Sequence, residues 1–149
     1  MFLTSHFCFI RAYLIGINLL SANIPEKKLF ALWEIIVIIG FVIFFAIFML
    51  KRKMATSPFI FIPVIIYGGV ITTMICKACV LGYTAFNNGI GLPALICAGL
   101  GALLFVMSDF SISILMFDKT QKKNFKLKLF NMYTYFAAEI LLASLIYFI

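Results

Sequence analysis

Charged side chains are scarce in this sequence. Only 11% of its 149 residues are Asp, Glu, Lys or Arg, whereas 65% are hydrophobic and the mean hydropathy is +1.18. Soluble domains average about 25% charged and about 45–50% apolar residues. A water-soluble protein of this length needs many more polar side chains to cover its surface, so a soluble globular fold is excluded and lipid is the expected solvent.

Metal-binding and catalytic motifs are also scarce. The chain has one histidine, and its four cysteines, Cys8, Cys76, Cys79 and Cys97, all lie inside apolar segments. Cys76 and Cys79 have the spacing of a redox or zinc pair, but such a zinc site needs a second pair of ligands. We interpret the four cysteines as small apolar membrane residues. The sequence contains no phosphate-binding loop, GxSxG elbow or HExxH pair, and we expect no metal and no cofactor.

The basic residues that are present lie in short segments between apolar stretches. Twelve Lys and Arg against five Asp and Glu give a net charge of +7. A nucleic-acid-binding protein would gather such charge on one face, whereas membrane proteins place it in the loops that set their orientation. The pattern therefore predicts a membrane topology and no nucleic-acid partner.

Five apolar stretches are long enough to cross a bilayer. A span of ~30 Å takes roughly 20 residues, and every backbone polar group must be paired within the segment, so helices are expected. We predict an all-α, polytopic transmembrane bundle in a single domain, 1–149. Its helices are expected at about residues 2–20, 29–50, 59–81, 92–117 and 129–149. A signal peptide is the alternative for the first stretch, but residues 1–7 lack a basic region.

Loop charge predicts the orientation. Residues 51–57 carry three positive charges and residues 118–128 carry five against one Asp, whereas residues 82–91 carry none. Because cytoplasmic loops are enriched in Lys and Arg, both basic loops are predicted to be cytoplasmic. The amino terminus is then inside and the carboxyl terminus outside.

Two acidic residues inside the predicted helices are candidates for chemistry. An ionisable group in hydrocarbon costs on the order of 2.5–3.5 kcal/mol by insertion scales, so it needs a partner, a bundle interior or a water cavity. At ~1.5 Å per residue, Asp109 lies ~12 Å and Glu139 ~15 Å from the cytoplasmic face, and His6 lies ~6 Å from it. The three side chains could meet in the inner half of the bilayer, near Ser108 and Tyr135. The alternative is a hydrogen-bond cluster that only holds helices together.

Other polar and small residues in the helices receive structural interpretations. Lys77 and Arg11 have long stems that can reach an interface, Lys77 the outer one, and Arg11 is a candidate contact for lipid head groups. A group of small residues should allow close helix approach. Its members are Ala94, Ala98, Gly99, Gly101 and Ala102.

Three segments carry a family resemblance. GALLFVMSD at residues 101–109 resembles the signature of the YhhN family of lysoplasmalogenases, a GALLF run followed by two hydrophobic residues and SD. FLTSHFCFI at residues 2–10 is similar to the family's FLxxH segment, although Phe9 stands where the family has Tyr. YTYFAAEILL at residues 133–142 is similar to its YYxAQ-LLI ending, although Glu139 stands where the family has Gln.

The resemblance covers nearly the whole chain but only the carboxyl-terminal part of the family, whose members have more helices. It therefore implies that amino-terminal helices with a GD motif are missing here. A homo-oligomer, or an upstream partner chain that supplies those helices, is a possible arrangement. The family also suggests an integral protein of the bacterial inner membrane.

The resemblance implies cleavage of the vinyl ether bond of a lysoplasmalogen, giving a fatty aldehyde and a glycerophospho head group. Protonation of carbon limits this hydrolysis, so a carboxylic acid kept neutral by an apolar site would serve as the general acid. Asp109 is expected to be that acid or the matching base. Glu139, or the aspartate of the absent GD motif, would activate water, and His6 and Tyr135 would orient groups or share the proton. The expected substrate-binding residues are Tyr67, Ser108, Tyr135 and Arg11.

A second interpretation belongs to another class of protein. The chain could be a non-catalytic, truncated membrane protein or a small carrier, in which the buried carboxyl groups stabilise packing or relay protons. In either case its surroundings are the lipid bilayer.

Overall fold

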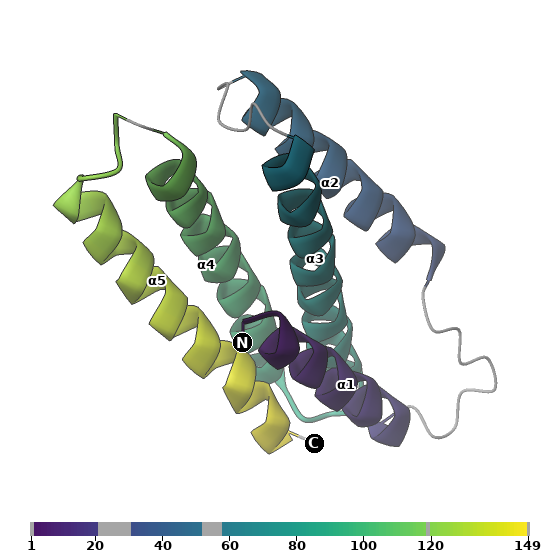
Figure 1. The fold of residues 1–149 in the computed structure, drawn as a ribbon. Helices are drawn as coiled ribbons and strands as arrows, with labels where there is room; N and C mark the ends of the chain where they lie inside the picture. The colour runs from purple at the N-terminus through teal and green to yellow at the C-terminus, as the bar shows by residue number, and fades with distance from the viewer. Residues whose placement is uncertain (1, 21–30, 52–57, 119, 149) are drawn as a thin grey trace.

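The protein is an all-α bundle, as the sequence predicts. A computed structural model describes residues 2–20, 31–51, 58–118 and 120–148. The order of elements is α1 (Phe2–Leu20), α2 (Leu32–Lys51), α3 (Pro58–Asn87), α4 (Leu92–Phe117), α5 (Phe125–Ser144) and a final 3₁₀ turn, η1 (Leu145–Phe148). Figure 1 shows α3 between α2 and α4, α5 on the far side of α4, and α1 crossing the lower half of the bundle.

Four of the helices are long and apolar enough to cross a membrane. They are α2, α3, α4 and the helical region Phe125–Tyr147, whereas the apolar part of α1, Thr4–Leu20, is shorter. Large hydrophobic side chains are exposed on the outside of every helix. Such a surface is unfavourable in water and favourable in hydrocarbon. The chain is therefore an integral membrane protein.

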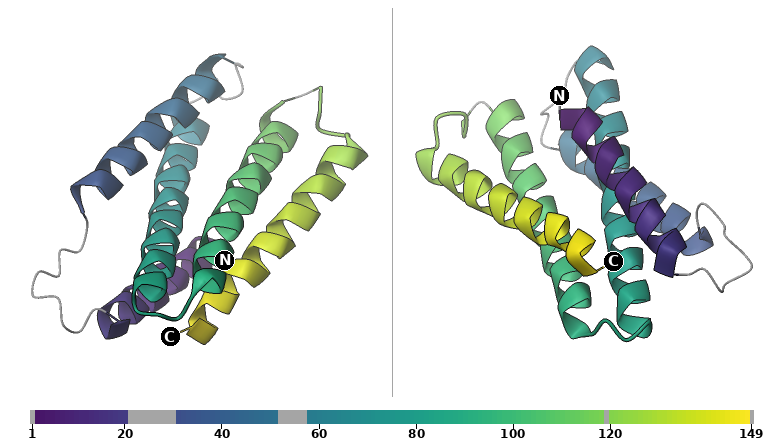
Figure 2. Two further views of the ribbon diagram at one scale, coloured as in Figure 1. Left: turned by 180° about the vertical axis from the view of Figure 1, so that it is seen from behind. Right: turned by 90° about the horizontal axis from the view of Figure 1, so that it is seen from below.

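Helix α1 differs in placement from the other helices. Its first residues lie at mid-height in the bundle, and it runs obliquely toward the end where α3 meets α4 (Figures 1 and 2). The buried hydroxyl of Tyr13 donates to the carbonyl oxygen of Leu142 at 3.0 Å. That carbonyl belongs to the last turn of α5. Tyr13 therefore fastens α1 to the end of α5.

The bounds of three helices differ from the expected ones. Helix α2 spans Leu32–Lys51, whereas hydropathy predicts 29–50. The apolar pattern suggested an end near residue 81 for α3, but the helix continues for another turn and a half to Asn87 and stops at a turn around Gly89, whose φ is +82°. Helix α5 begins four residues before the expected position 129. The side chain of Asn124 caps it by accepting the backbone N–H of Leu127 at 3.2 Å, which hydropathy alone does not register. The expected ranges 2–20 and 92–117 coincide with α1 and α4.

Small residues bring α4 close to its two neighbours. Ala94, Ala98, Gly101 and Ala102 are buried, as expected for packing positions. Gly99 is exposed and has no neighbour in reach of an added Cβ, so the packing role expected for it is wrong. On α3, a Cβ added to Gly82 would lie 2.5 Å from the Cβ of Ala98. Only glycine fits this contact, which sets the separation of α3 and α4.

A buried ion pair joins α2 to α3. Lys77 is 3% exposed, and its Nζ lies 2.7 Å from Oε2 of Glu34, which is 2% exposed. The same oxygen accepts the backbone N–H of Ala31 at 3.3 Å. The expectation that Lys77 reaches the outer interface is therefore wrong. Hydropathy gives the depth of Lys77 but not the face of α3 on which it lies, and that face is covered by α2.

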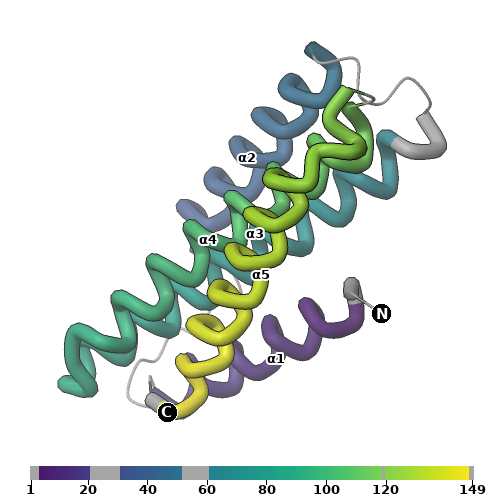
Figure 3. The backbone as a smooth tube through the Cα atoms, turned by 90° about the vertical axis from the view of Figure 1, so that its left-hand side faces the viewer, coloured from purple at the N-terminus to yellow at the C-terminus, as the bar shows by residue number. Residues whose placement is uncertain are grey.

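Five of the seven described basic residues gather at one end of the bundle. Lys51 ends α2, and four further lysines lie at or after the connection from α4 to α5, namely Lys122, Lys123, Lys126 and Lys128. Figures 1 and 3 show the end of α2 and the start of α5 at the same end, which we call the basic end. Arg52, Lys53 and Lys119 lie outside the described residues.

Candidate active site

A cavity of about 250 Å³ lies between α2, α3 and α4. Most of its lining is apolar, and three lining side chains carry polar atoms: Tyr67 on α3, and Asp109 and Ser113 on α4. The apolar lining residues are Phe41, Phe45, Pro63, Val64, Gly68, Phe110, Ile112, Met116 and Phe117. Asp109 is the acidic residue of this lining.

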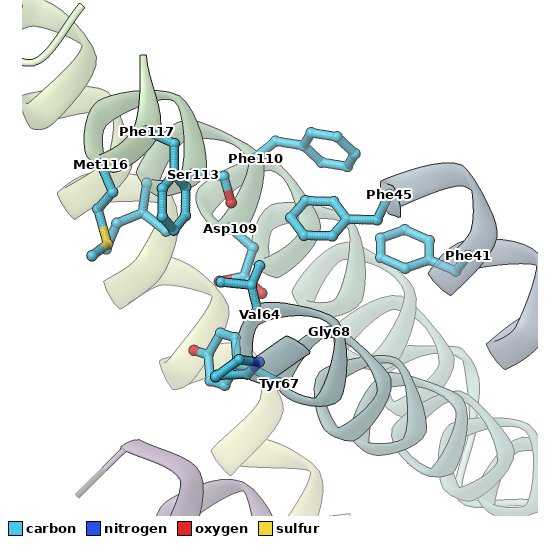
Figure 4. Close-up of a pocket in the computed structure, with 12 residues that line it drawn as sticks. Phe41, Phe45, Val64, Tyr67, Gly68, Asp109, Phe110, Ser113, Met116 and Phe117 are labelled. Atoms are coloured by element: carbon cyan, nitrogen blue, oxygen red, sulfur yellow. The ribbon is translucent and has the colours of Figure 1, made fainter. Parts of the chain in front are cut away.

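Figure 4 shows the Asp109 side chain between Ser113 and Tyr67, directed toward α3. Among the described residues, no donor forms a hydrogen bond with its carboxyl group. Asp109 lies eight residues before the end of α4 and Tyr67 nine residues after the start of α3, so both are roughly 12–14 Å along the helix axis from the basic end. The carboxyl group therefore faces the cavity at a depth well inside the hydrocarbon.

Tyr67 connects the cavity to the other predicted site residues. Its hydroxyl lies 3.4 Å from Nε2 of His6, and the two rings are 5.8 Å apart. The phenol is also within electrostatic range of Asp109, Tyr135 and Glu139. The structure thus gathers residues from α1, α3, α4 and α5 around one tyrosine.

His6 lies behind Tyr67 and does not line the cavity. It is fully buried, with its ring against the edge of Phe105 at a centroid distance of 5.4 Å. Its Nδ1 is buried and has no hydrogen-bond partner in the described part of the chain, which is uncommon for a buried polar atom. His6 therefore reaches the cavity through Tyr67.

Glu139 and Tyr135 lie on the α5 side of Tyr67. They are one turn apart on α5 and interact with each other, and the Tyr135 ring packs on Phe105 at 5.9 Å. Neither residue lines the cavity that contains Asp109. Glu139 is therefore within electrostatic range of Tyr67 but outside the lining of the cavity that contains Asp109.

Two other predicted residues lie away from the cavity. Ser108 is buried between α4 and α5, where its hydroxyl donates to Oδ1 of Asn131 at 2.9 Å. Arg11 is exposed on α1, the helix that runs away from the basic end (Figure 1). Ser108 thus pairs two helices, and Arg11 lies on the exposed side of α1, outside the cavity.

Sequence reasoning missed the aromatic wall of the cavity and its serine. Phe110 packs against a run of α2 rings at centroid distances of 5.3–6.3 Å, namely Phe41, Phe44, Phe45 and Phe48. Ser113 follows Asp109 by four residues, a spacing that places both on one face of a helix. That spacing is visible in the sequence, but nothing there indicates which face borders a cavity.

No group of three or more His, Cys, Asp or Glu side chains suited to hold a metal ion occurs within the described ranges. Cys76 is buried, Cys79 and Cys97 are partly buried, Cys8 is exposed, and all four are free thiols.

These features define a polytopic α-helical membrane protein with a carboxyl group in an apolar cavity. The family model described as the YhhN family matches residues 1–146, so the chain belongs to the YhhN family. No curated protein matches the sequence. No solved structure matches it either.

Proposed function

We propose that this protein is a lysoplasmalogenase-like hydrolase, which cleaves the vinyl ether bond of a lysoplasmalogen within the bilayer. The observation that carries the proposal is the Asp109 carboxyl group, which lines an apolar cavity among helices that cross a membrane. Membership of the YhhN family supports it. We also propose the bacterial inner membrane as its location, with the basic end in the cytoplasm.

The reaction needs a proton donor at carbon. Asp109 gives a proton to the double-bond carbon that is not bonded to the ether oxygen. This step leaves an oxocarbenium ion at the carbon that is bonded to that oxygen. Water adds to that carbon and loses a proton, and the resulting hemiacetal splits into the aldehyde and the free sn-1 hydroxyl of the glycerol. A carboxyl group in apolar surroundings suits the first step, because such sites keep carboxylic acids available as proton donors.

Tyr67 is proposed to orient the reacting group, because its ring lines the same cavity as Asp109. His6, at 3.4 Å from the Tyr67 hydroxyl, positions that phenol. Glu139 and Tyr135 lie within electrostatic range of Tyr67, so Glu139 is proposed to receive the proton lost by water through the phenol. Ser108 is proposed to support the site indirectly, because its hydrogen bond to Asn131 holds α4 against α5. Arg11 is proposed to contact bilayer head groups.

The size of the cavity fits part of a lipid. Sites for whole drug-sized ligands run about 300–1,000 Å³, and this cavity is about 250 Å³. It can hold the vinyl ether and glycerol of the substrate while the hydrocarbon chain extends into the bilayer along the lipid-facing helices. The head group then lies toward the basic end.

The proposal is tested by product analysis. Purified protein in detergent micelles is given a lysoplasmalogen and, separately, the saturated alkyl ether of the same head group. We expect aldehyde from the vinyl ether in equal amount to the released head-group product, and none from the alkyl ether. Absence of aldehyde from the vinyl ether, also with a second copy or an upstream chain supplied, would refute the reaction.

One contact separates the hydrolase from the non-catalytic alternative by experiment. The bond from His6 to Tyr67 joins α1 to α3 and would stabilise the bundle whether or not the protein is an enzyme. The alternative predicts that Tyr67→Phe lowers the unfolding temperature without any measurable reaction in the wild type. The hydrolase predicts a loss of turnover in Tyr67→Phe at temperatures where the variant is folded.

A further inference from the structure

Ser113 is a polar group of the cavity that the reaction above does not use. It is 7% exposed, and it lines the cavity one helical turn closer to the basic end than Asp109. Within the described residues its hydroxyl has no hydrogen-bond partner. Ser113 lines the cavity and its oxygen is not fully enclosed by protein atoms, so the hydroxyl is available to a bound molecule.

Other buried serines of α4 behave differently. The hydroxyl of Ser111, which is 5% exposed, donates to the carbonyl oxygen of Met107 at 2.8 Å, and that of Ser108 donates to Asn131 at 2.9 Å. Both are therefore satisfied inside the protein. Figure 4 shows Ser113 on the cavity side of α4, together with Asp109.

We propose that Ser113 recognises the free sn-2 hydroxyl of a lysolipid, and so selects lipids with one chain over lipids with two. This inference rests on the proposed function, because it places the vinyl ether at Asp109. Ser113 then lies on the head-group side of the reacting carbon, which is where the glycerol lies.

The spacing of the two polar groups supports this assignment. Five bonds separate the sn-2 oxygen from the carbon that accepts the proton, and at ~1.4–1.5 Å per bond they span about 6 Å at most. Asp109 and Ser113 are four residues apart, which is a rise of ~6 Å along α4. One lipid can therefore face both side chains.

The same contact would also disfavour lipids with two chains. An ester at the sn-2 position removes the hydroxyl donor and adds a second hydrocarbon chain beside Ser113. The cavity of about 250 Å³ has little room for that chain. A site that hydrogen-bonds a hydroxyl discriminates against analogues that lack it, because its own polar group is left without a partner.

The test measures binding, so that it does not depend on turnover. The probes are a saturated alkyl ether lysophospholipid, which cannot be hydrolysed, and its 2-deoxy analogue, which differs only in lacking the hydroxyl. Native mass spectrometry of the protein in detergent micelles gives the ratio of the two Kd values. We expect the wild type to bind the hydroxyl-bearing probe about threefold to tenfold more tightly, the range for one neutral hydrogen bond.

Three variants make the result specific. Ser113→Ala should bind both probes equally, Ser113→Thr should retain the preference, and the matched control Ser111→Ala should behave as the wild type. No preference in the wild type, no binding of either probe, or an unchanged preference in Ser113→Ala would overturn the proposal. If the preference is present but no aldehyde forms from the vinyl ether, the hydrolase reaction fails and the lysolipid site stands.

Discussion

Replacing Lys77 with methionine should strongly destabilise the protein. Lys77 and Glu34 are both nearly inaccessible, and the 2.7 Å contact between them is the charged link from α2 to α3. Methionine has a similar volume to lysine and no charge. The substitution therefore leaves the Glu34 carboxylate buried, with the N–H of Ala31 as its remaining donor among the described residues.

The expected cost follows from this burial. Removing one partner of a buried pair costs about 3–5 kcal/mol, because the remaining charge is uncompensated. Glu34→Gln should cost less, about 1–3 kcal/mol, because the amide oxygen still accepts from Lys77 and from the backbone. The double variant, with both substitutions, is neutral at both positions and should be more stable than Lys77→Met alone.

The assay is equilibrium unfolding in mixed detergent micelles, followed by helical circular dichroism. Lys51→Met is the matched control, because Lys51 is exposed at the end of α2, and it should change the unfolding free energy by less than about 0.5 kcal/mol. A loss below about 1 kcal/mol in Lys77→Met, or a double variant less stable than Lys77→Met, would refute the reasoning. Either result would mean that loss of the Lys77–Glu34 ion pair does not lower the free energy of unfolding.

Two further substitutions test how the helices are held together. Tyr13→Phe should cost about 1–3 kcal/mol of unfolding free energy, since it leaves the Leu142 carbonyl without its donor, and an unchanged unfolding midpoint would contradict this contact. Gly82→Val should cost at least about 1–3 kcal/mol, because its side chain overlaps α4, whereas Gly99→Ala, which meets nothing within 4 Å, should be neutral or slightly stabilising. The same unfolding assay compares the two glycines, and equal effects would show that α3 and α4 do not pack as described.

Much of the fold follows from hydropathy alone, because lipid requires apolar helices of a minimum length. The range 92–117 coincides with α4 since Gly91 and Pro93 start that helix and the apolar run continues to its end. The early start of α5 depends on the cap at Asn124, and the oblique path of α1 depends on tertiary contacts such as that of Tyr13. Those contacts join residues far apart in sequence, so hydropathy does not contain them.

Residue counting predicted only part of the site. It gave the depth of Asp109, but His6 lies beside Tyr67, deeper than the ~6 Å predicted. The structure places Asp109 and Glu139 within electrostatic range of the same tyrosine. Which side chains face the cavity depends on the rotation of each helix, which a nearly uniform apolar sequence does not specify. For that reason Glu139 was expected beside Asp109, and Ser113 was missed.

The central claim is that Asp109 delivers the proton that cleaves the lipid. Its most direct test is the rate of aldehyde release from a lysoplasmalogen by Asp109→Asn, with Asp118→Asn as a control that removes a carboxyl group at the end of the same helix, outside the cavity. We predict that Asp109→Asn lowers turnover about 10²–10⁴-fold while it still binds the alkyl ether probe, and that Asp118→Asn has wild-type turnover. Wild-type turnover in Asp109→Asn would contradict the account.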